Sequence, residues 1–460
     1  MFKYLLLAIV ILQNMLFAQP TVFNKVSYQM QFPNNAVRMG NHYLIGNNQG
    51  DKFSLTEIDS TGNIVNNSNY GTPGWDLPNI TRKQTNNEIF MMGHTFWDGV
   101  ANIGNYKGYV VITDSIGIFK KSFVVKSNTT IFNRVLNGIF LDGYYYFVGE
   151  DIENNFIPTP LLFLCKTDTV GNILWYKKFP QLGIKVGTRV GLEYTYDQTN
   201  FLVGVGHEDS VVGNYYYYSY FLMRIDTSGN FINRIPVPEF ASNIHYTGVQ
   251  YINQISKMFN NKYLVCGHRE YYLLDSQYSI LDSFDLVQYL YDGYFAHQNL
   301  YDSSYIVGGY QAFGKIYKGV EQFGKDFANE PDIIFVKDVI PTYDGGYLAI
   351  ILCTGGVTRY IKMDCDGNYV NPIYCWATGT NELTKIDLQM NFYNNRYSFN
   401  NKSEFKLEAK LFDLQGRALQ QFAIEKGISN MGIGNYAKGI YVIAITHDEK
   451  KKKTENILLE

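Results

Sequence analysis

The chain has 460 residues and a formal net charge of −3, from 39 Lys and Arg against 42 Asp and Glu. This near balance excludes a strongly basic nucleic-acid-binding protein and a polyacidic tail protein. Hydrophobic residues make up 46% of the chain, which excludes global disorder. With 39 Tyr, 31 Phe and 41 Gly but only 12 Pro, the composition favours many short strands joined by tight turns.

The N-terminal segment has the parts of a secretory signal peptide. Lys3 supplies a positive charge, residues 5–12 are an unbroken apolar run, and Ala18 precedes a polar residue. The alternative is a membrane anchor, but the run is shorter than the about 20 apolar residues that span a bilayer. We expect residues 1–18 to be removed during export, leaving a mature chain without a transmembrane segment.

A short strand-like pattern then recurs seven times along the chain. Each copy follows a turn residue and has an aromatic or apolar residue, a few apolar residues and, in six copies, a Gly. The copies occupy residues 43–46, 89–93, 145–149, 201–204, 263–267, 305–308 and 347–350. Apolar runs this short between turn residues predict buried strands rather than helices.

A second pattern, Asp-x-x-Gly-Asn, follows each copy of the first. It is clearest from Asp59, Asp168 and Asp226, and weaker copies lie at positions 114, 275, 321 and 364. The Asp side chain can accept hydrogen bonds from its own turn, and Gly adopts the positive φ that the turn requires. We predict a hairpin turn between two strands at each copy, with decayed versions at Asp275 and Glu321.

The spacing of these turns predicts the architecture. Successive copies lie 43 to 58 residues apart, with several strands in each interval. That period is typical of a β-propeller, in which each small sheet buries its faces against its neighbours. We therefore predict an all-β protein whose residues 19–378 form a propeller of about seven blades. An array of β-sandwiches is the competing interpretation.

The repeats resemble two propeller families. The turn from Asp168 through Gly171 to Trp175 resembles that of quinoprotein-type repeats, but only this copy has the Trp, so the likeness concerns the fold and not a quinone cofactor. The whole region, with Tyr347 after the Asp-Gly-Gly of residues 344–346, is similar to the secreted Asp-Gly-Gly-Tyr propellers of Bacteroidetes. This resemblance implies an exported propeller without an assigned activity.

The C-terminal part has a different pattern. Residues 379–388 are polar and predict a linker, and residues 389–460 predict a small β-sandwich, because residues 405–411 alternate as a half-buried strand does. This unit resembles the type A C-terminal sorting domain of the Bacteroidetes type IX secretion system. The residues that carry the resemblance are Asp413, Gly416, Lys438, Gly439 and Tyr441.

The resemblance implies that the type IX machinery is a partner and that the protein reaches the outer-membrane surface or the medium after periplasmic transit. The alternative is a β-sandwich that serves as a cap or an adhesion domain.

A few residues could carry chemistry or modification. His94, His207 and His268 follow the first pattern and are candidate metal ligands, but polar residues are expected where a strand leaves the core, so we expect no metal and no cofactor. Cys365 and Cys375 flank a turn and could form a disulfide. Three short Asp-Ser/Thr-apolar sequences fit the O-glycosylation sequon of Bacteroidetes exports, at Ser115, Thr169 and Ser210.

The sequence contains no nucleophile elbow, zinc-protease motif or phosphate-binding loop. Catalytic carboxylates cannot be chosen, because turns explain the conspicuous Asp residues. Our leading hypothesis is an exported, non-catalytic propeller that binds a glycan or a surface protein. The alternative is a secreted hydrolase or lyase that acts on polysaccharide.

Overall fold

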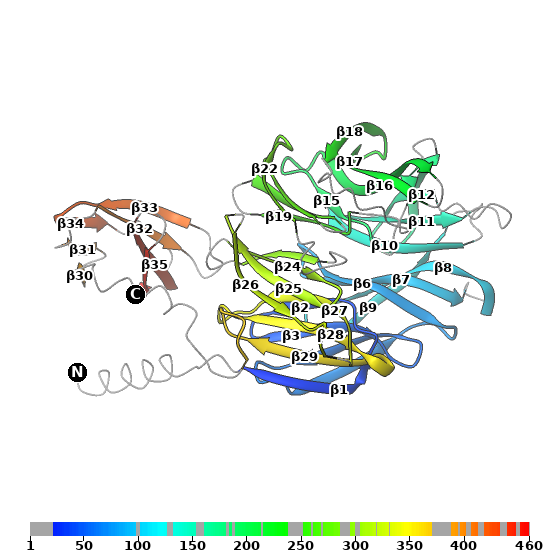
Figure 1. The fold of residues 1–460 in the computed structure, drawn as a ribbon, viewed down its shortest axis with the longest axis horizontal. Coiled ribbons are helices and arrows are strands. Elements are labelled where there is room, and N and C mark those ends of the chain that lie inside the picture. The colour runs from blue at the N-terminus through cyan, green and yellow to red at the C-terminus, as the bar shows by residue number, and fades with distance from the viewer. Residues whose placement is uncertain are drawn as a thin grey trace. The chain divides into compact units, whose positions relative to one another are not determined.

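The computed structural model confirms an all-β protein with a propeller and a small C-terminal two-sheet unit (Figure 1). The chain divides into two compact units, Thr21–Val370 and a unit that includes Asn371–Glu460. The predicted signal peptide, and the predicted linker up to residue 387, lie outside the residues described. Those described are 22–97, 102–126, 132–152, 161–180, 184–185, 189–212, 215–237, 252–258, 261–267, 270–285, 295–299, 304–318, 320–330, 332–369, 388–393, 396–401, 406–412, 418–432, 439–447 and 451–459.

The propeller has seven antiparallel blades of four main strands. Blades 1 to 3 are β2 (Ala36–Met39), β3 (His42–Asn48), β4 (Phe53–Ile58) and β5 (Ile64–Tyr70); β6 (Asp76–Lys83), β7 (Ile89–Trp97), β8 (Asn102–Thr113) and β9 (Phe119–Val125); and β10 (Phe132–Leu141), β11 (Tyr144–Ile152), β12 (Leu161–Thr167) and β13 (Ile173–Lys178).

Blade 4 has an additional two-residue strand, β14 (Ile184–Lys185), beside its inner strand. Blades 4 to 6 are β15 (Leu192–Tyr194), β16 (Asn200–Val212), β17 (Tyr215–Asp226) and β18 (Phe231–Val237); β19 (Gln254–Met258), β20 (Lys262–Cys266), β21 (Glu270–Leu274) and β22 (Ile280–Asp285); and β23 (Phe295–Gln298), β24 (Tyr305–Gly309), β25 (Ala312–Tyr317) and β26 (Val320–Asp326).

Blade 7 closes the ring by combining the two ends of the repeat region. Its first three strands are β27 (Ile333–Pro341), β28 (Tyr347–Cys353) and β29 (Val357–Met363), and the fourth is β1 (Phe23–Gln31), which pairs antiparallel with β29. A short 3₁₀ turn, η3 (Thr354–Gly356), lies between β28 and β29. None of the described segments is a helix long and apolar enough to cross a membrane.

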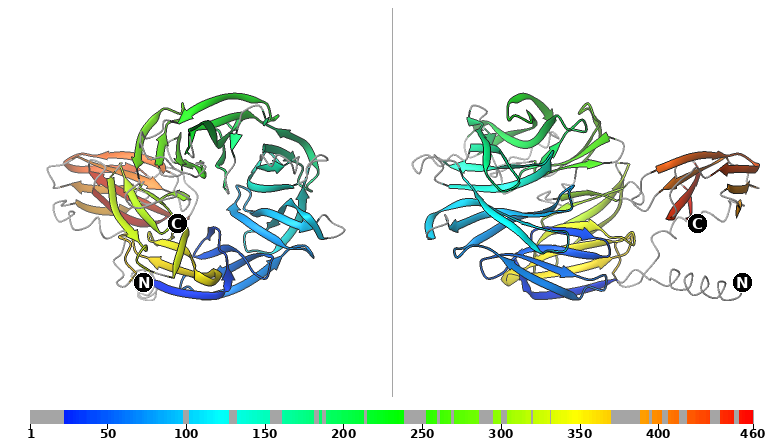
Figure 2. Two further views of the ribbon diagram at one scale, coloured as in Figure 1. Left: turned by 45° about the vertical axis from the view of Figure 1, so that its right-hand side comes forward. Right: turned by 180° about the vertical axis from the view of Figure 1, so that it is seen from behind.

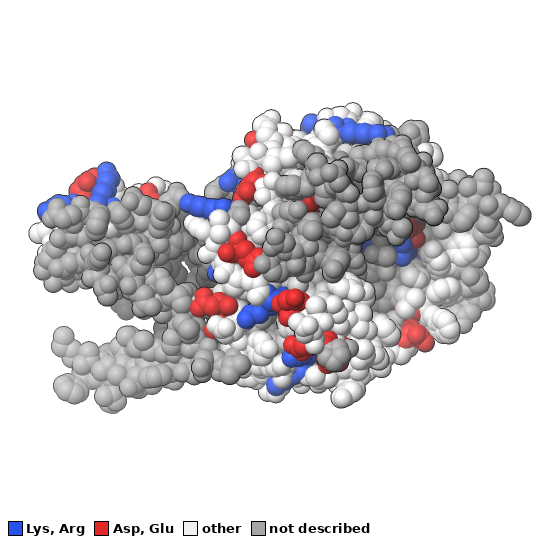
Figure 3. Space-filling model, in the orientation of Figure 1, with Lys and Arg blue, Asp and Glu red and all other residues white. Residues whose placement is uncertain are grey.

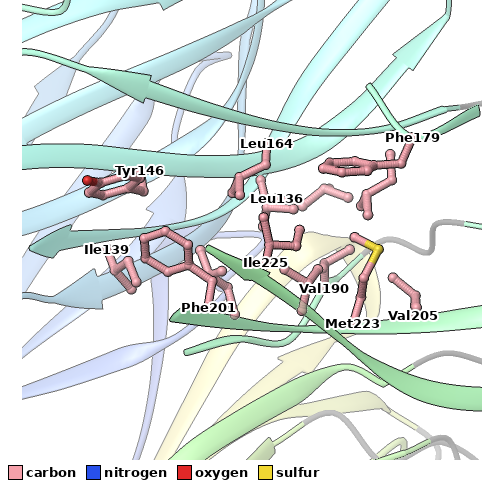
Figure 4. Close-up of a cluster of buried hydrophobic side chains, with 14 of the residues drawn as sticks. Leu136, Ile139, Tyr146, Leu164, Phe179, Val190, Phe201, Val205, Met223 and Ile225 are labelled. Carbon is pink, nitrogen blue, oxygen red and sulfur yellow. The ribbon is translucent and has the colours of Figure 1, made fainter. Parts of the chain in front are cut away.

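The inner strand of every blade contacts the inner strands of both neighbours, so the ring is closed (Figure 2, left). Seven clusters of buried side chains fill the spaces between adjacent blades, one per space. Figure 4 shows the cluster between blades 3 and 4, where Tyr146 and Leu164 face Phe201 and Met223. Each blade is covered on both faces, which explains why the first sequence pattern is continuously apolar instead of alternating.

The Gly of that pattern is required by close packing within the blade. A Cβ atom on Gly93 would lie 2.0 Å from the carbonyl oxygen of Leu77, and one on Gly149 would lie 2.0 Å from that of Arg134. Real Cβ atoms do not approach a backbone oxygen so closely, so the inner strand can lie against the second strand only where a side chain is missing.

The predicted Asp turns are present in six blades. In each, the Asp Oδ1 accepts hydrogen bonds of 2.8 to 3.0 Å from the backbone N–H groups two and four residues later; the residues are Asp59, Asp114, Asp168, Asp226, Asp275 and Asp364. Asp364 therefore caps a turn, as its spacing predicted. In blade 5 the position of the Gly is taken by Tyr278, with φ of 67°.

The prediction of a turn at Glu321 is wrong. Glu321 lies inside β26 and pairs with Ile316, and the hairpin of blade 6 is the tighter one between Tyr317 and Val320. A tight hairpin turn needs a positive φ, and Lys318 has a φ of 50° there, so this turn forms without an Asp cap. The copy at Asp364 differs too, because the fourth strand of its blade comes from the N-terminal end of the propeller.

The C-terminal unit has two sheets. One contains β30 (Leu388–Tyr393), β31 (Arg396–Asn401) and β34 (Gly427–Gly432), and the other contains β33 (Ala418–Ile424), β32 (Leu407–Phe412), β35 (Gly439–His447) and β36 (Lys451–Leu459). Phe399 of the first sheet stacks on Phe422 of the second, with ring centroids 6.2 Å apart. The sheets therefore pack face to face, as a small sandwich requires.

Candidate functional site

The candidate site is the central channel, a cavity of about 620 Å³ lined by the inner strands of all seven blades. A volume of this size is typical of a small-molecule site. One residue that lines the channel from each blade, in order from blade 1 to blade 7, is Arg38, Lys83, Asn137, Glu193, Lys257, His297 and Asp338.

Asp338 joins three blades at the wall of the channel. Its Oδ2 accepts hydrogen bonds from the Ala36 backbone N–H at 3.0 Å and from Asn35 Nδ2 at 3.4 Å, both in the segment that opens blade 1. Its Oδ1 lies 2.7 Å from Nε2 of His297 in blade 6. The carboxylate is almost fully buried, so its hydration is replaced by these contacts.

Asn137 and Gln254 occupy the equivalent position in blades 3 and 5. In the sheet of its own blade, each lies opposite the second-strand residue that directly precedes the Gly of the first sequence pattern. Asp338 lies opposite the corresponding second-strand residue of blade 7. Asn137 Nδ2 donates to the Val190 carbonyl at 2.9 Å. The Gln254 amide exchanges two bonds with the backbone of Ala296, at 2.9 and 3.1 Å. In three blades, therefore, one polar side chain binds the backbone of the following blade.

Two guanidinium groups extend over longer distances. Arg82 of blade 2 lies 2.7 Å from the Glu193 carboxylate of blade 4 and donates to Asn137 Oδ1 of blade 3 at 3.2 Å. Arg189, in the segment that precedes blade 4, donates to the Asn34 carbonyl at 3.3 Å, beside blade 1. The contacts of Arg82 with Glu193 and of Arg189 with Asn34 connect blades that are not neighbours, so the basic side chains also shape the channel.

The channel is basic although the chain carries a net charge of −3. Five basic residues line it (Arg38, Arg82, Lys83, Arg189 and Lys257) against two acidic ones (Glu193 and Asp338), an excess of three positive charges with His297 counted as neutral. By contrast, acidic and basic side chains are interspersed over the propeller face shown in Figure 3. Both channel carboxylates already have partners, Arg82 for Glu193 and His297 for Asp338.

Burial and mutual repulsion lower the pKa values of the lysines in and beside the channel. The pKa of Lys83 is lowered by burial and then by the charge of Arg38. Burial lowers the pKa of Lys257 to about 8; Glu193 partly opposes this shift, and Arg82 adds to it. The pKa of Lys337 on β27 is also lowered to about 8, by burial and by Arg189. Negative charge brought into the channel would relieve this repulsion.

The three candidate histidines lie in different parts of the chain. His94, on β7 in blade 2, packs against Phe96 and Tyr106, and burial followed by repulsion from Arg134 lowers its pKa to about 4. His207 is on β16 in blade 4, with its side chain outside the described residues, and His268 lies wholly outside them. Within the described ranges, no three His, Cys, Asp or Glu residues could hold a metal ion.

The other predicted sites have these locations. Ser115 and Thr169 lie in the Asp turns of blades 2 and 3, where Thr169 is exposed, and Ser210 lies on β16. Gly439 and Tyr441 begin β35, opposite Leu459 and Ile457 of β36.

The remaining sorting residues and one cysteine lie outside the described residues, namely Asp413, Gly416, Lys438 and Cys375. Cys365, the predicted disulfide partner of Cys375, is buried.

None of the sequence patterns described above singles out the basic channel residues. One signal could have found three of them: Arg38, Lys83 and Lys257 lie five or six residues before the first pattern of their blade. That segment is the inner strand, so a basic residue there lies beside the channel.

The seven blades and their lined channel define the chain as a propeller. No family model matches it, and no curated protein matches its sequence. Among solved structures, a protein of unknown function from Bacteroides caccae is 12% identical with a TM-score of 0.36, covering 72% of this chain and 93% of that one.

Two further structures are similar at the same level. The extracellular domain of a protein described as a hybrid two-component system from B. thetaiotaomicron is 11% identical with a TM-score of 0.46, covering 96% of this chain and 59% of that one. A puromycin hydrolase mutant is 10% identical with a TM-score of 0.46, covering 80% and 58%.

Proposed function

We propose that this chain is an exported, non-catalytic propeller that binds a ligand in its central channel. The observation that carries the proposal concerns the channel wall. All seven blades line it, and both acidic side chains in its described wall have a side-chain partner, Arg82 for Glu193 and His297 for Asp338. Hydrolysis of a glycosidic bond by an acid and a base needs carboxylates that can exchange protons with the substrate. Glu193 and Asp338 serve instead to join blades.

A polysaccharide hydrolase or lyase is the second candidate, and one contact favours it. His297 lines the channel and pairs with the buried Asp338, an arrangement in which a carboxylate can orient an imidazole base. A screen of the purified chain on polysaccharides distinguishes the two functions. If residues 19–460 release product and His297→Gln abolishes that release, the enzymatic function replaces the binding proposal. If the chain binds a polysaccharide without releasing product, the binding proposal is supported.

For delivery, we propose that the C-terminal unit is a type IX sorting domain. The resemblance rests on Asp413, Gly416, Lys438, Gly439 and Tyr441, and the support from the structure is that this unit is compact by itself. Deleting residues 384–460 should leave a folded propeller in the periplasm. Fusing residues 384–460 behind an unrelated exported reporter should carry it to the surface or medium in a host with that system.

The sharpest variants for this test are Gly439→Ala and Tyr441→Ala, at the start of β35. We expect both to reduce surface delivery of the reporter without changing its folding, which a protease-resistance assay on periplasmic extract checks. If the truncated protein reaches the surface at normal yield, the unit has a structural role and the sorting proposal fails.

A further inference from the structure

We propose that the central channel binds a small polyanion, an organic molecule with two or more carboxylate, sulfate or phosphate groups. The inference rests on the proposed function, in which the channel is the binding site, and adds the chemical class of its ligand. It depends on cations at two places in the wall: Arg38 with Lys83, and Lys257.

The first group is Arg38 and Lys83, on the neighbouring inner strands β2 and β6. Neither side chain has a hydrogen-bond or ion-pair partner among the described residues, and Arg38 Nη1 is fully buried. A buried guanidinium nitrogen without an acceptor is costly, since it has lost its water and gained nothing in return. An anionic oxygen placed between Arg38 and Lys83 would supply that acceptor and reduce the repulsion of the two cations.

The second place is Lys257, on the inner strand β19 of blade 5. Lys257 Nζ donates to the Thr195 carbonyl at 3.1 Å and lies 3.3 Å from the centroid of the Tyr194 ring. These contacts hold the ammonium group in place but provide no negative charge. Blade 5 lies across the ring from blades 1 and 2, with two blades between them on either side. A ligand that reaches both places therefore needs two separate anionic groups.

The other classes of ligand fit the wall less well. A cationic ligand would need a carboxylate, and both described ones are occupied. A neutral sugar would fill the volume but leave the repulsion between the lysines and arginines unchanged. The volume of about 620 Å³ suits a molecule the size of a disaccharide rather than a folded partner.

Titration calorimetry on residues 19–460 at low ionic strength tests the inference. The probes are digalacturonate and citrate as polyanions, inorganic sulfate as a single anionic group, and cellobiose as a neutral sugar of matched size. We expect a polyanion to bind at least about tenfold more tightly than sulfate, no measurable binding of cellobiose, and weaker binding as salt is added.

Variants locate the site. Lys83→Met and Lys257→Met nearly preserve side-chain volume, and Arg38→Gln removes the charge but keeps a polar end. Each should weaken polyanion binding by about tenfold or more. Lys177→Met is the matched control, since Lys177 is exposed on the outer strand β13 and should leave affinity unchanged. Circular dichroism and the unfolding midpoint confirm that each variant is folded.

Several outcomes overturn the inference. If polyanions bind equally to wild type, Arg38→Gln and Lys257→Met, the anion site is elsewhere. If sulfate binds as tightly as citrate and digalacturonate, the claim of two groups fails. If cellobiose binds as tightly as digalacturonate, and Arg38→Gln weakens the binding of cellobiose, the channel is a binding site but not one for polyanions. Absence of binding by both polyanions at millimolar concentration also rejects the proposal.

Discussion

Two parts of the propeller use polar side chains in opposite ways. In the outer turns, each Asp bonds within its own turn, as Asp226 does with the backbone of Ser228 and with the backbone and side chain of Asn230. Around the channel, polar groups bond to another blade, as Asp338 does with Ala36 and His297. The first kind of contact forms as soon as the turn forms, and the second exists only when the ring is complete.

Buried tyrosine hydroxyls extend this second kind of contact outward from the channel. Tyr271 of blade 5 donates to the Phe295 and Gly308 carbonyls of blade 6, both at 3.3 Å. Tyr360 of blade 7 donates to the Gly62 carbonyl of blade 1 at 3.1 Å. The comparison teaches that repeated local groups form the blades and non-repeated buried groups join them, so substitutions in the two regions should differ in cost.

The largest expected effect is alkaline unfolding. Burial, and then neighbouring charges, raise the pKa of Tyr271, Tyr145 and Tyr360 above their ordinary value of 10. The protonated hydroxyls of these tyrosines therefore stabilise the folded protein fully below pH 10. This stabilisation is lost as pH rises further, because the same tyrosines ionise more readily in the unfolded chain. The lowered pKa values of Lys257 and Lys337 have the opposite effect on stability: they raise the free energy of unfolding as pH rises, but only between pH 8 and 10.5.

Absorbance at 295 nm and far-UV circular dichroism during a pH titration check this expectation. The signal of the buried tyrosinates should appear together with loss of β-structure, above pH 10.5. Ionisation of nearly all tyrosines while the β-signal persists would show that their hydroxyls do not hold the blades together.

Next in size is the substitution Asp338→Ala. It leaves the Ala36 N–H and His297 Nε2 without their partner at a buried site, and we expect a loss of about 3 kcal/mol in the free energy of unfolding. Urea unfolding measures it. Asp338→Asn keeps the shape and one acceptor oxygen, so its loss should be smaller; equal losses would mean that the negative charge matters more than the bridging.

The same contrast explains what the sequence could predict. Asp59 and Asp168 were recognisable because each bonds within five residues, so the pattern is local. Asp338 and Ala36 are 302 residues apart, and nothing in the neighbourhood of either residue indicates the other. The blade architecture was therefore predictable from spacing, whereas the channel wall appears only after the ring closes.

The predictions that failed or lay out of reach have physical causes as well. At Glu321 an acidic residue and a downstream Gly324 imitate the turn pattern, but the tighter hairpin at Lys318 places both in a strand. The histidines shared a position relative to the pattern, yet His94 and His207 belong to blades 2 and 4. Similar position in a repeat does not bring side chains together unless the blades are adjacent.

A smaller effect is expected for Asp226→Ala in the outer turn of blade 4. Burial would raise the pKa of Asp226, but hydrogen bonds from Asn230 and Ser228 outweigh it and lower the pKa. Its stabilisation is thus present above pH 4 and is lost as pH falls through the lowered value. Because these hydrogen bonds lie in a surface turn where water can replace them, we expect a loss of about 1 kcal/mol or less by urea unfolding at pH 7. A loss as large as that of Asp338→Ala would remove the distinction between the two regions.

The smallest effect is expected for Tyr278→Gly, in the one Asp turn that has no glycine. At φ of 67° a residue with a Cβ carries about 1 kcal/mol of strain, which Gly removes. The Tyr278 ring, however, packs on Tyr263, with centroids 5.8 Å apart, as part of the cluster between blades 4 and 5. Loss of that packing costs about 1 kcal/mol.

The two effects of Tyr278→Gly should therefore nearly cancel, with a net change within about 0.5 kcal/mol in urea unfolding at neutral pH. Tyr278→Ala separates them, because it loses the ring and keeps the strain, and it should destabilise by about 1 kcal/mol more than Tyr278→Gly. If Gly and Ala destabilise equally, the turn of blade 5 carries no strain. The tyrosine then acts only between blades, and this turn belongs with the groups that join the ring.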